Sequence, residues 1–115
     1  MQSLYLESDF FLMPSRGESA AIVYCEAMTS GCPSLAARTG GIATIVQDDV
    51  TGRLVDWGPN TVNELADYAI RLHGDPASYR ALCESCYRTF LAEFQWEVGW
   101  RKLGEILEQT VRPAP

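Results

Sequence analysis

The sequence predicts an α/β fold in which a small parallel sheet is covered by helices. Short apolar runs stopped by turn residues are typical of buried parallel strands. Segments with helical spacing of apolar residues separate these runs, and strands that alternate with helices favour a parallel sheet with right-handed crossovers. The predicted strands are Phe10–Met13, Pro33–Ala37 and Arg53–Asp56.

Residues that favour helix ends mark the boundaries of several predicted helices. Gly31 follows an apolar helical segment and is a natural helix C-cap, while Asp75 with Pro76 is a favourable helix start. The helical segments are, in chain order, the end of a helix at Ser3–Leu6, then Ala20–Ser30, one turn at Ile42–Val46, a helix that Asn60 or Thr61 can cap, a helix from Asp75 to about Phe94, and a last helix from Trp96 to about Thr110.

Taken together, these elements form half of a Rossmann-like fold: a three-layer half-domain with a small parallel sheet and C-terminal helices. We expect one partial domain over residues 1–115, with a frayed tail at 111–115. The strand Phe10–Met13 lies at one edge of the predicted sheet. It is apolar and carries no feature that would prevent further strand pairing.

Composition excludes two classes of partner. The chain of 115 residues has 9 basic and 15 acidic residues, a formal net charge of −6. An acidic chain without a basic stripe is a poor ligand for nucleic acid and for anionic membranes. No apolar run reaches the roughly 20 residues that a membrane helix needs, and no leader pattern is visible. We therefore expect a soluble, cytoplasmic protein.

The four cysteines predict ordinary thiols on or near an apolar face rather than a metal site. Cys83 and Cys86 form a C-x-x-C, but a zinc site needs two more ligands at matching spacing. Cys25 and Cys32 lack that spacing. The single histidine, His73, lies at the end of a predicted helix and is expected to act as a C-terminal cation or polar cap.

Aromatic residues are expected to pack rather than to bind ligand. We assign packing roles to the three tryptophans, Trp57, Trp96 and Trp100, and expect Tyr24 and Tyr87 to be partly buried on helices.

The stretch with the clearest chemistry lies where the first strand ends. A loop there presents Glu18, and a helix begins directly after it. The free amides of a helix's first turn point into the crevice at the carboxyl end of a parallel sheet, a geometry that binds phosphate. Glu26 follows eight residues later, on the order of 10 Å along a helix. That distance suits a sugar and a ribose at the two ends of a diphosphate, because carboxylates accept hydrogen bonds from hydroxyls.

This stretch resembles the E-x7-E motif of retaining glycosyltransferases of group 1, the family 4 type with the GT-B fold. Glu18 and Glu26 stand at its two glutamate positions. Further motifs resemble the family in the right order between Ser8 and about Leu107. They are Ser8–Arg16, Glu26–Pro33, Arg38–Ile42 with its double glycine, Asp49–Val55 and Phe94–Trp96.

The resemblance implies a donor site for a nucleotide-diphosphate sugar and sugar transfer with retention at the anomeric carbon. Glu18 would contact hydroxyls of the donor sugar, and Glu26 would bind the ribose. The backbone amides that begin the helix would hold the diphosphate, and the double glycine would shape the sugar side. No metal or cofactor is implied. The substrate-binding residues on this basis are Ser19, Ala20, Ala21, Ile22, Glu26, Gly40 and Gly41.

The chain departs from the family at several positions. Ala20 and Ala21 stand where the family has a bulky residue and glycine, Ala43-Thr44 replaces proline and glutamate, and Asp48-Asp49 replaces an aspartate-glycine turn. The family's basic pair, its base pocket and its acceptor domain lie upstream of the matched region. Arg16 and Arg38 are basic and close to the crevice, and we interpret both as solvated loop charges.

Two functions therefore stay open. The chain is either a glycosyltransferase fragment with half of a donor site, inactive alone, or a catalytically silent self-associating or partner-binding module derived from that family. In both cases the apolar edge and the terminal helix, with Trp96, Trp100, Leu103 and Ile106, predict a homo-oligomer or an N-terminal domain as partner.

Overall fold

The computed structural model describes residues 2–14 and 22–110. Its elements, in chain order, are α1 (Gln2–Glu7), β1 (Phe11–Met13), α2 (Ile22–Met28), β2 (Ser34–Ala37), the 3₁₀ turn η1 (Ile42–Thr44), β3 (Gly52–Val55), α3 (Thr61–His73), α4 (Pro76–Thr89), the π-helical turn η2 (Phe90–Phe94) and α5 (Trp96–Thr110). The expected frayed tail at 111–115 lies outside the described residues.

The strands form the predicted parallel sheet in the order β1-β2-β3. Leu35 of β2 lies between Leu12 of β1 and Arg53 of β3. The predicted strand boundaries were wrong by one residue at most ends, because Phe10, Pro33 and Asp56 lie outside the strands and Gly52 belongs to β3. Strand ends depend on which backbone groups of a neighbour lie in register, and a local apolar run does not specify that.

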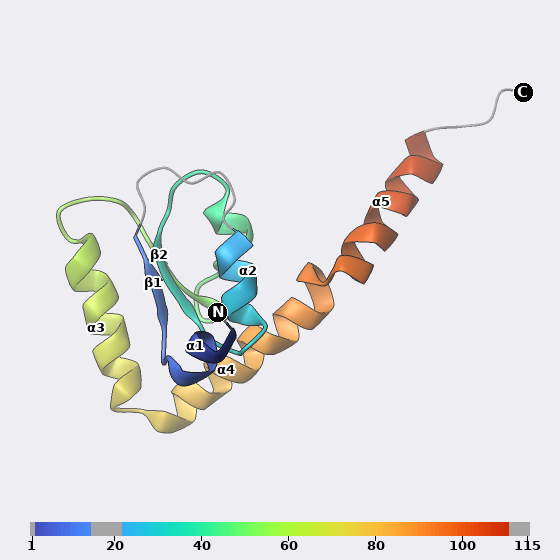
Figure 1. Cartoon of the computed structure of the whole chain (residues 1–115). Helices are drawn as coiled ribbons and strands as arrows, with labels where there is room; N and C mark the ends of the chain where they lie inside the picture. The colour runs from blue at the N-terminus through green and yellow to red at the C-terminus, as the bar shows by residue number, and fades with distance from the viewer. Residues whose placement is uncertain (1, 15–21, 111–115) are drawn as a thin grey trace, which may run out of the picture.

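Helices cover both faces of the sheet, which gives the predicted three layers (Figure 1). Successive residues of a strand point to opposite faces. Leu35 of β2 and Val55 of β3 accordingly pack against α3, whereas Ala36 and Leu54 pack against α2 and η1. α4 contributes to both cores, with Leu82 on the α3 side and Cys86 on the α2 side. Helices therefore pack on both faces of the sheet, and this packing fixes the position of the carboxyl ends of the strands.

The structure confirms the predicted end of α2 at Gly31 and the predicted start of α4 at Asp75. Gly31 has a φ of +64°, a left-handed conformation that glycine adopts without strain, in the turn after α2. The Asp75 carboxylate accepts a hydrogen bond from the Ser78 backbone amide at 3.2 Å, which caps α4. Of the two cap candidates for α3, Asn60 stands at the N-cap without a side-chain cap bond, and the Thr61 hydroxyl instead bonds the preceding turn.

The turn before β3 contains a residue with a positive φ. Asp49 has a φ of +60°, which glycine tolerates best and aspartate tolerates better than most residues. Its carboxylate accepts a hydrogen bond from the Tyr68 hydroxyl at 2.9 Å. The side chain that strains the backbone thus makes a tertiary contact that glycine could not make.

α5 projects away from the compact part of the molecule (Figure 1). The whole molecule measures 62 × 29 × 24 Å along its principal axes. Within α5 only Val98 is buried. The packing role expected for the tryptophans is wrong for Trp96 and Trp100, which are 74% and 65% exposed, and Trp57 is 45% exposed. Helical spacing showed correctly that Trp96 and Trp100 share one face of α5. It could not show that the described chain leaves that face uncovered.

The thiols occupy the apolar positions that the sequence indicated. All four cysteines are free, with Cys32 and Cys86 buried and Cys25 and Cys83 partly buried. Burial raises the pKa of Cys32 to about 11 and that of Cys86 to about 12, so both are held as thiols at neutral pH. Residues 2–14 and 22–110 contain no cluster of three or more potential metal ligands.

Candidate functional site

The candidate site lies at the carboxyl end of the sheet, where the three parallel strands finish at the same edge. β1 leads into Pro14, β2 leads into the Gly40-Gly41 turn, and β3 leads into Asp56. Figure 1 shows the segments that follow β2 and β3 leaving the sheet at this same end. Glu18, Ser19, Ala20 and Ala21 fall outside the described residues, so their predicted roles stay predictions.

Tyr24 fixes the start of α2 against the end of β1. Its hydroxyl donates a hydrogen bond to the carbonyl of Met13, the last residue of β1, at 2.9 Å. Its ring meets Phe11 edge-on with centroids 5.4 Å apart, and the side chain is fully buried. We expected Tyr24 to be only partly buried. A tyrosine among the apolar positions of a helix directly after a strand is the one signal that could have indicated this bond.

The double glycine lies in the connection from β2 to η1. Gly40 has a φ of +53°, which explains why glycine stands at this position. Gly41 begins the turn η1, and its carbonyl accepts a hydrogen bond from the Thr44 hydroxyl at 2.6 Å. The next residue, Ile42, is fully buried in the same core as Tyr24. η1 and α2 therefore contribute side chains to one hydrophobic core.

Two of the predicted site residues, Ile22 and Glu26, lie on α2, and both are accessible. Ile22, the first residue of α2, is 64% exposed, and Glu26 is exposed one turn further along. Glu26 lies on the side of α2 near α1. Burial raises the pKa of the Tyr5 phenol on α1, and the nearby Glu26 carboxylate raises it further. The Glu26 carboxylate is thus placed at the surface, where it can accept hydrogen bonds from a ligand.

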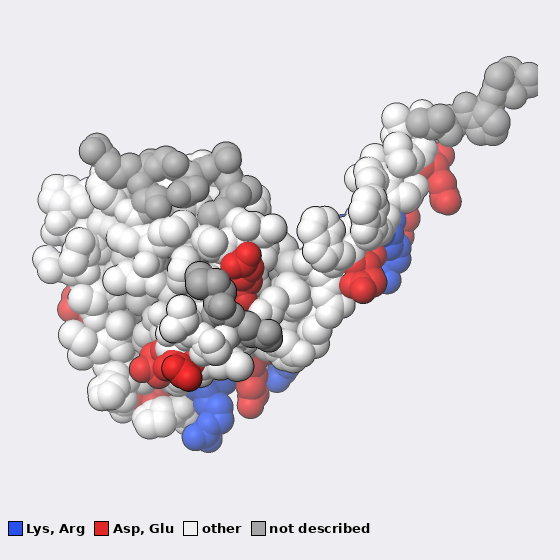
Figure 2. Space-filling view, in the orientation of Figure 1, with Lys and Arg blue, Asp and Glu red and all other residues white. Residues whose placement is uncertain are grey.

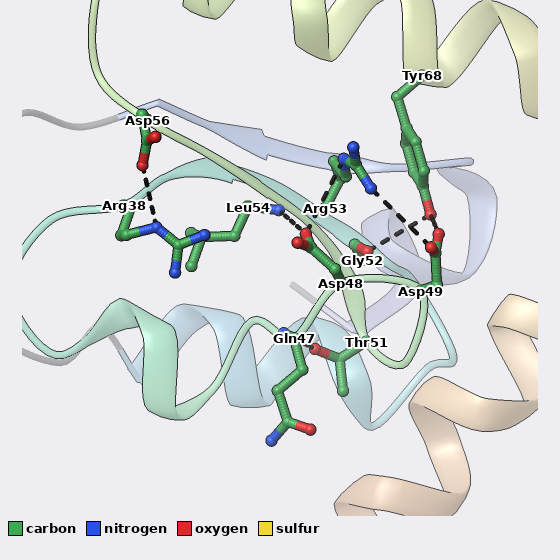
Figure 3. A network of polar contacts seen from close by, with 10 residues as sticks. All are labelled: Arg38, Gln47, Asp48, Asp49, Thr51, Gly52, Arg53, Leu54, Asp56 and Tyr68. Atoms are coloured by element: carbon green, nitrogen blue, oxygen red, sulfur yellow. Dashed lines mark hydrogen bonds and ion pairs between the residues drawn. The ribbon is translucent and has the colours of Figure 1, made fainter.

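Arg38 directly follows β2 at the carboxyl end of the sheet. Its Nε lies 3.1 Å from Oδ1 of Asp56, and both side chains are well exposed (Figure 3). Its backbone amide donates to the Val55 carbonyl at 2.7 Å, which continues the pairing of β2 with β3. The interpretation as a solvated loop charge is confirmed, with Asp56 as its partner. Arg16 lies outside the described residues.

A hollow with a volume of about 410 Å³ lies beside β3. The guanidinium groups of Arg53 and Arg71 lie 5.3 Å and 5.1 Å from the centroid of the Tyr68 ring. Acidic and basic side chains line the hollow in equal number: Arg38, Arg53, Arg71, Asp56, Glu64 and Asp67. Because these charges balance, the hollow does not favour a polyanionic ligand.

Sequence comparison agrees with this arrangement. The profile of the family described as glycosyl transferases group 1 matches residues 1–75. The chain belongs to this family. It is 32% identical to the D-inositol 3-phosphate glycosyltransferase of Corynebacterium kroppenstedtii, in an alignment that covers all of this chain and 25% of that protein. It is 36% identical to the N-acetyl-alpha-D-glucosaminyl L-malate synthase of Bacillus anthracis over 78% of this chain and 23% of that protein.

Solved structures carry the same fold. The sucrose-phosphate synthase from Thermosynechococcus elongatus aligns with a TM-score of 0.78 and 32% identity, over 93% of this chain and 26% of that one. Anabaena HepE, solved in complex with UDP-glucose, aligns with a TM-score of 0.76 and 24% identity, over 92% of this chain and 29% of that one. The group 1 chain described here therefore has the Rossmann-like architecture of GT-B glycosyltransferases.

The group 1 chain spans about a quarter of the length of the relatives it matches. Across residues 2–14 and 22–110, no helix has both the length and the apolar character needed to cross a bilayer.

Proposed function

We propose that this chain forms the second half of a donor-binding domain for a nucleotide-diphosphate sugar, in a glycosyltransferase that transfers a hexosyl group with retention. The observation that carries the proposal is the joint placement of α2 and the Gly40-Gly41 turn at the carboxyl end of adjacent parallel strands. Tyr24 holds the helix start in position there. By itself the 115-residue chain is proposed to be inactive, as a single partial domain.

Each site residue has a role in this proposal. Glu18 is the catalytic-face residue that contacts hydroxyls of the donor sugar, and Glu26 accepts hydrogen bonds from the ribose. Gly40 and Gly41 shape the sugar side of the crevice. The amides of the first turn, contributed by Ser19, Ala20, Ala21 and Ile22, hold the diphosphate. Three properties support this set: Glu26 is exposed, Ile22 is exposed at the start of α2, and Gly40 adopts the left-handed conformation.

Isothermal titration calorimetry and NMR with UDP, UDP-glucose and free glucose test donor binding. We expect weak binding of UDP and UDP-glucose, because the family's upstream basic pair is not in this chain, and no measurable binding of glucose alone. Since amides rather than a metal hold the diphosphate, EDTA should leave the affinity unchanged. Absence of binding for both nucleotides at millimolar concentration would refute the proposal.

Variants of the two glutamates separate their roles. Glu26→Ala should weaken UDP and UDP-glucose equally, because both contain the ribose. Glu18→Ala should weaken UDP-glucose while UDP binding stays close to that of the parent. Each lost charge-assisted contact is worth about 1.5–3 kcal/mol. Glu105→Ala, at an exposed glutamate of α5, is the matched control. If both variants bind like the parent, the glutamate assignments are wrong.

The alternative is a catalytically silent module that self-associates or binds a partner. The apolar face of α5 favours it, because Trp96, Trp100 and Ile106 are each more than half exposed. A homo-oligomer or an N-terminal domain is the proposed partner in either case. We also propose a cytoplasmic location, which the four free thiols support, because reducing compartments preserve thiols.

A further inference from the structure

Tyr5 of α1 carries a buried hydroxyl group without a hydrogen-bond partner in the described chain. The side chain is only 6% exposed, and its phenol oxygen makes no hydrogen bond within residues 2–14 and 22–110. A buried polar group in this condition has lost its contact with water and gained no replacement, so such groups are rare in folded proteins. The hydroxyl is therefore available as a donor to a group that moves into alignment with it.

Packing fixes the position of the Tyr5 ring. The ring packs with Ala27 of α2 and with Cys32 in a small apolar cluster. It also meets the ring of Phe11 in β1 edge-on, with centroids 5.8 Å apart. Because α2, β1 and the turn before β2 all contact the ring, its hydroxyl is held in place without a hydrogen bond of its own.

Glu26 of α2 is the acceptor beside this hydroxyl. It directly precedes Ala27, the α2 residue that packs with the Tyr5 ring. Burial raises the pKa of the Tyr5 phenol, and the Glu26 carboxylate, which lies within hydrogen-bonding reach, raises it further. The two groups therefore lie close together without an aligned hydrogen bond between them. One is buried with a proton to donate, and the other is exposed with lone pairs to accept it.

The Glu26 carboxylate has no basic partner in the described chain. None of the ion pairs among residues 2–14 and 22–110 includes it. Figure 2 shows acidic surface over α2 with no basic side chain against it. An exposed glutamate samples several rotamers, and binding a ligand through one of them costs the entropy of the others. A fixed donor beside the carboxylate would remove part of that cost.

We propose that Tyr5 is a positioning residue of the donor site, whose hydroxyl donates a hydrogen bond to the Glu26 carboxylate and holds it in the rotamer that accepts the ribose hydroxyls. The inference rests on the proposed function, because that function assigns the ribose to Glu26. Tyr5 itself does not touch the donor, since its side chain is buried. A carboxylate offers about four acceptor positions on its two oxygens, so one bond from Tyr5 leaves enough for the ribose.

NMR titration of UDP into a set of variants tests this role. Tyr5→Phe keeps the packed ring and removes the hydroxyl alone, so it should raise the dissociation constant of UDP by about three- to tenfold. Ser34→Ala is the matched control, because it removes another buried hydroxyl without a partner in the described chain, on β2. It should change the dissociation constant by less than about twofold. Circular dichroism checks that both variants keep their helices.

A double variant separates positioning from a structural role. In the Glu26→Ala background there is no carboxylate to position, so adding Tyr5→Phe should change the dissociation constant of UDP by less than about twofold. If Tyr5 only supported the packing of α1 on α2, its effect would persist in that background.

The contact itself is testable without nucleotide. In protein labelled with ¹³C at the tyrosine Cζ, NMR follows the titration of the Tyr5 phenol, and Tyr5→Phe identifies its resonance. Glu26→Gln should lower the pKa of Tyr5 relative to the parent, because it removes the nearby negative charge. Glu7→Gln, at an exposed glutamate of α1 itself, is the control and should leave the titration of Tyr5 unchanged.

The outcomes distinguish this inference from the proposed function. If the parent does not bind UDP at millimolar concentration, the proposed function is wrong and the role of Tyr5 is wrong with it. If UDP binds but Tyr5→Phe binds it like the parent, or if the effect of Tyr5→Phe persists in the Glu26→Ala background, only the role of Tyr5 is overturned. A titration of Tyr5 that Glu26→Gln leaves unchanged would also overturn that role, because the two groups would then not be in contact.

Discussion

The two edges of the sheet are built in opposite ways. At the outer edge of β3, the Asp48 carboxylate accepts a hydrogen bond from the Leu54 backbone amide at 2.8 Å (Figure 3). Arg53 on the same strand lies 3.9 Å from the carboxylates of Asp48 and Asp49. At the outer edge of β1, no other strand within residues 2–14 and 22–110 pairs with the backbone, and Leu12 is 60% exposed.

This difference indicates which edge ends the sheet and which can be extended. A side-chain acceptor on an edge amide, with charges beside it, prevents another strand from pairing there. An apolar edge without such groups is a template for pairing. Beside β1 a hollow of about 150 Å³ lies between the strand and α3, lined by apolar residues that include Leu12, Val62 and Ala66. β1 is therefore the edge at which a further strand and helix would fit.

The largest effect is expected at Gly52, the first residue of β3. A Cβ added at Gly52 would lie 1.8 Å from the Ser34 carbonyl oxygen, and both belong to paired backbones that cannot move independently. Gly52→Ala should therefore lower the free energy of unfolding by more than about 3 kcal/mol, measured by urea titration. Gly58→Ala, where an added Cβ meets nothing within 4 Å, should change it by less than about 1 kcal/mol. Equal effects would mean that β2 and β3 are less tightly registered than described.

The closed edge can be opened at Asp48. Asp48→Ala should lower the free energy of unfolding by about 1–2 kcal/mol, because the Leu54 amide loses its charged acceptor. Hydrogen exchange at the Leu54 amide should accelerate, while exchange at Leu35 in the central strand should not. Asp67→Ala, on the exposed side of α3, is the control. Unchanged exchange at Leu54 would show that Asp48 does not protect this edge.

The open edge should respond differently to an added charge. Leu12→Lys should lower the free energy of unfolding by less than about 1 kcal/mol, because most of the leucine is already exposed and the lysine stem keeps part of its contacts. Aggregation during thermal unfolding should nevertheless slow, because a lysine on an edge strand opposes pairing. Light scattering at matched concentration measures this. Leu6→Lys on α1, at a comparably exposed leucine, should not slow aggregation.

Local patterns were sufficient to predict the fold. Apolar runs predicted the three strands, and Gly31 and the Asp75-Pro76 pair predicted helix ends that the structure confirms. The difference between the open β1 edge and the protected β3 edge was harder to predict from the sequence. The sequence indicated the unprotected edge at Phe10–Met13, but the protection of β3 depends on Asp48 folding back onto Leu54, a tertiary contact that periodicity does not encode.

The site was predictable only in part. Resemblance placed Gly40 and Glu26, and the structure gives the first a left-handed backbone and the second an exposed position. The bond from Tyr24 to Met13 depends on how α2 packs on β1, so it could not be derived from sequence spacing. The burial of the tryptophans was also a tertiary question: their helical face was predicted correctly, but its exposure depends on the direction in which α5 leaves the core.

The smallest effect concerns alkaline pH and again compares the two edges. Burial raises the pKa of Tyr68 beside β3, and the Asp49 carboxylate, which accepts a hydrogen bond from the Tyr68 hydroxyl, raises this pKa further. Burial also raises the pKa of Tyr79, whose hydroxyl donates to the Asp9 carbonyl just before β1 at 2.7 Å. A folded-state pKa above the unfolded value of about 10 means that the folded protein holds the proton more tightly. This stability is complete below pH 10 and is lost as pH rises above it.

Between pH 9 and 10.5, each tyrosine should account for less than about 1 kcal/mol of the fall in the free energy of unfolding. In urea titrations at several pH values, Tyr68→Phe and Tyr79→Phe should each flatten the alkaline decline, and their double variant should flatten it by the sum, because the residues lie beside opposite edges. If Tyr68→Phe declines in parallel with the parent, the Asp49 contact does not hold the β3 edge in solution, and the two edges differ less than their hydrogen bonds indicate.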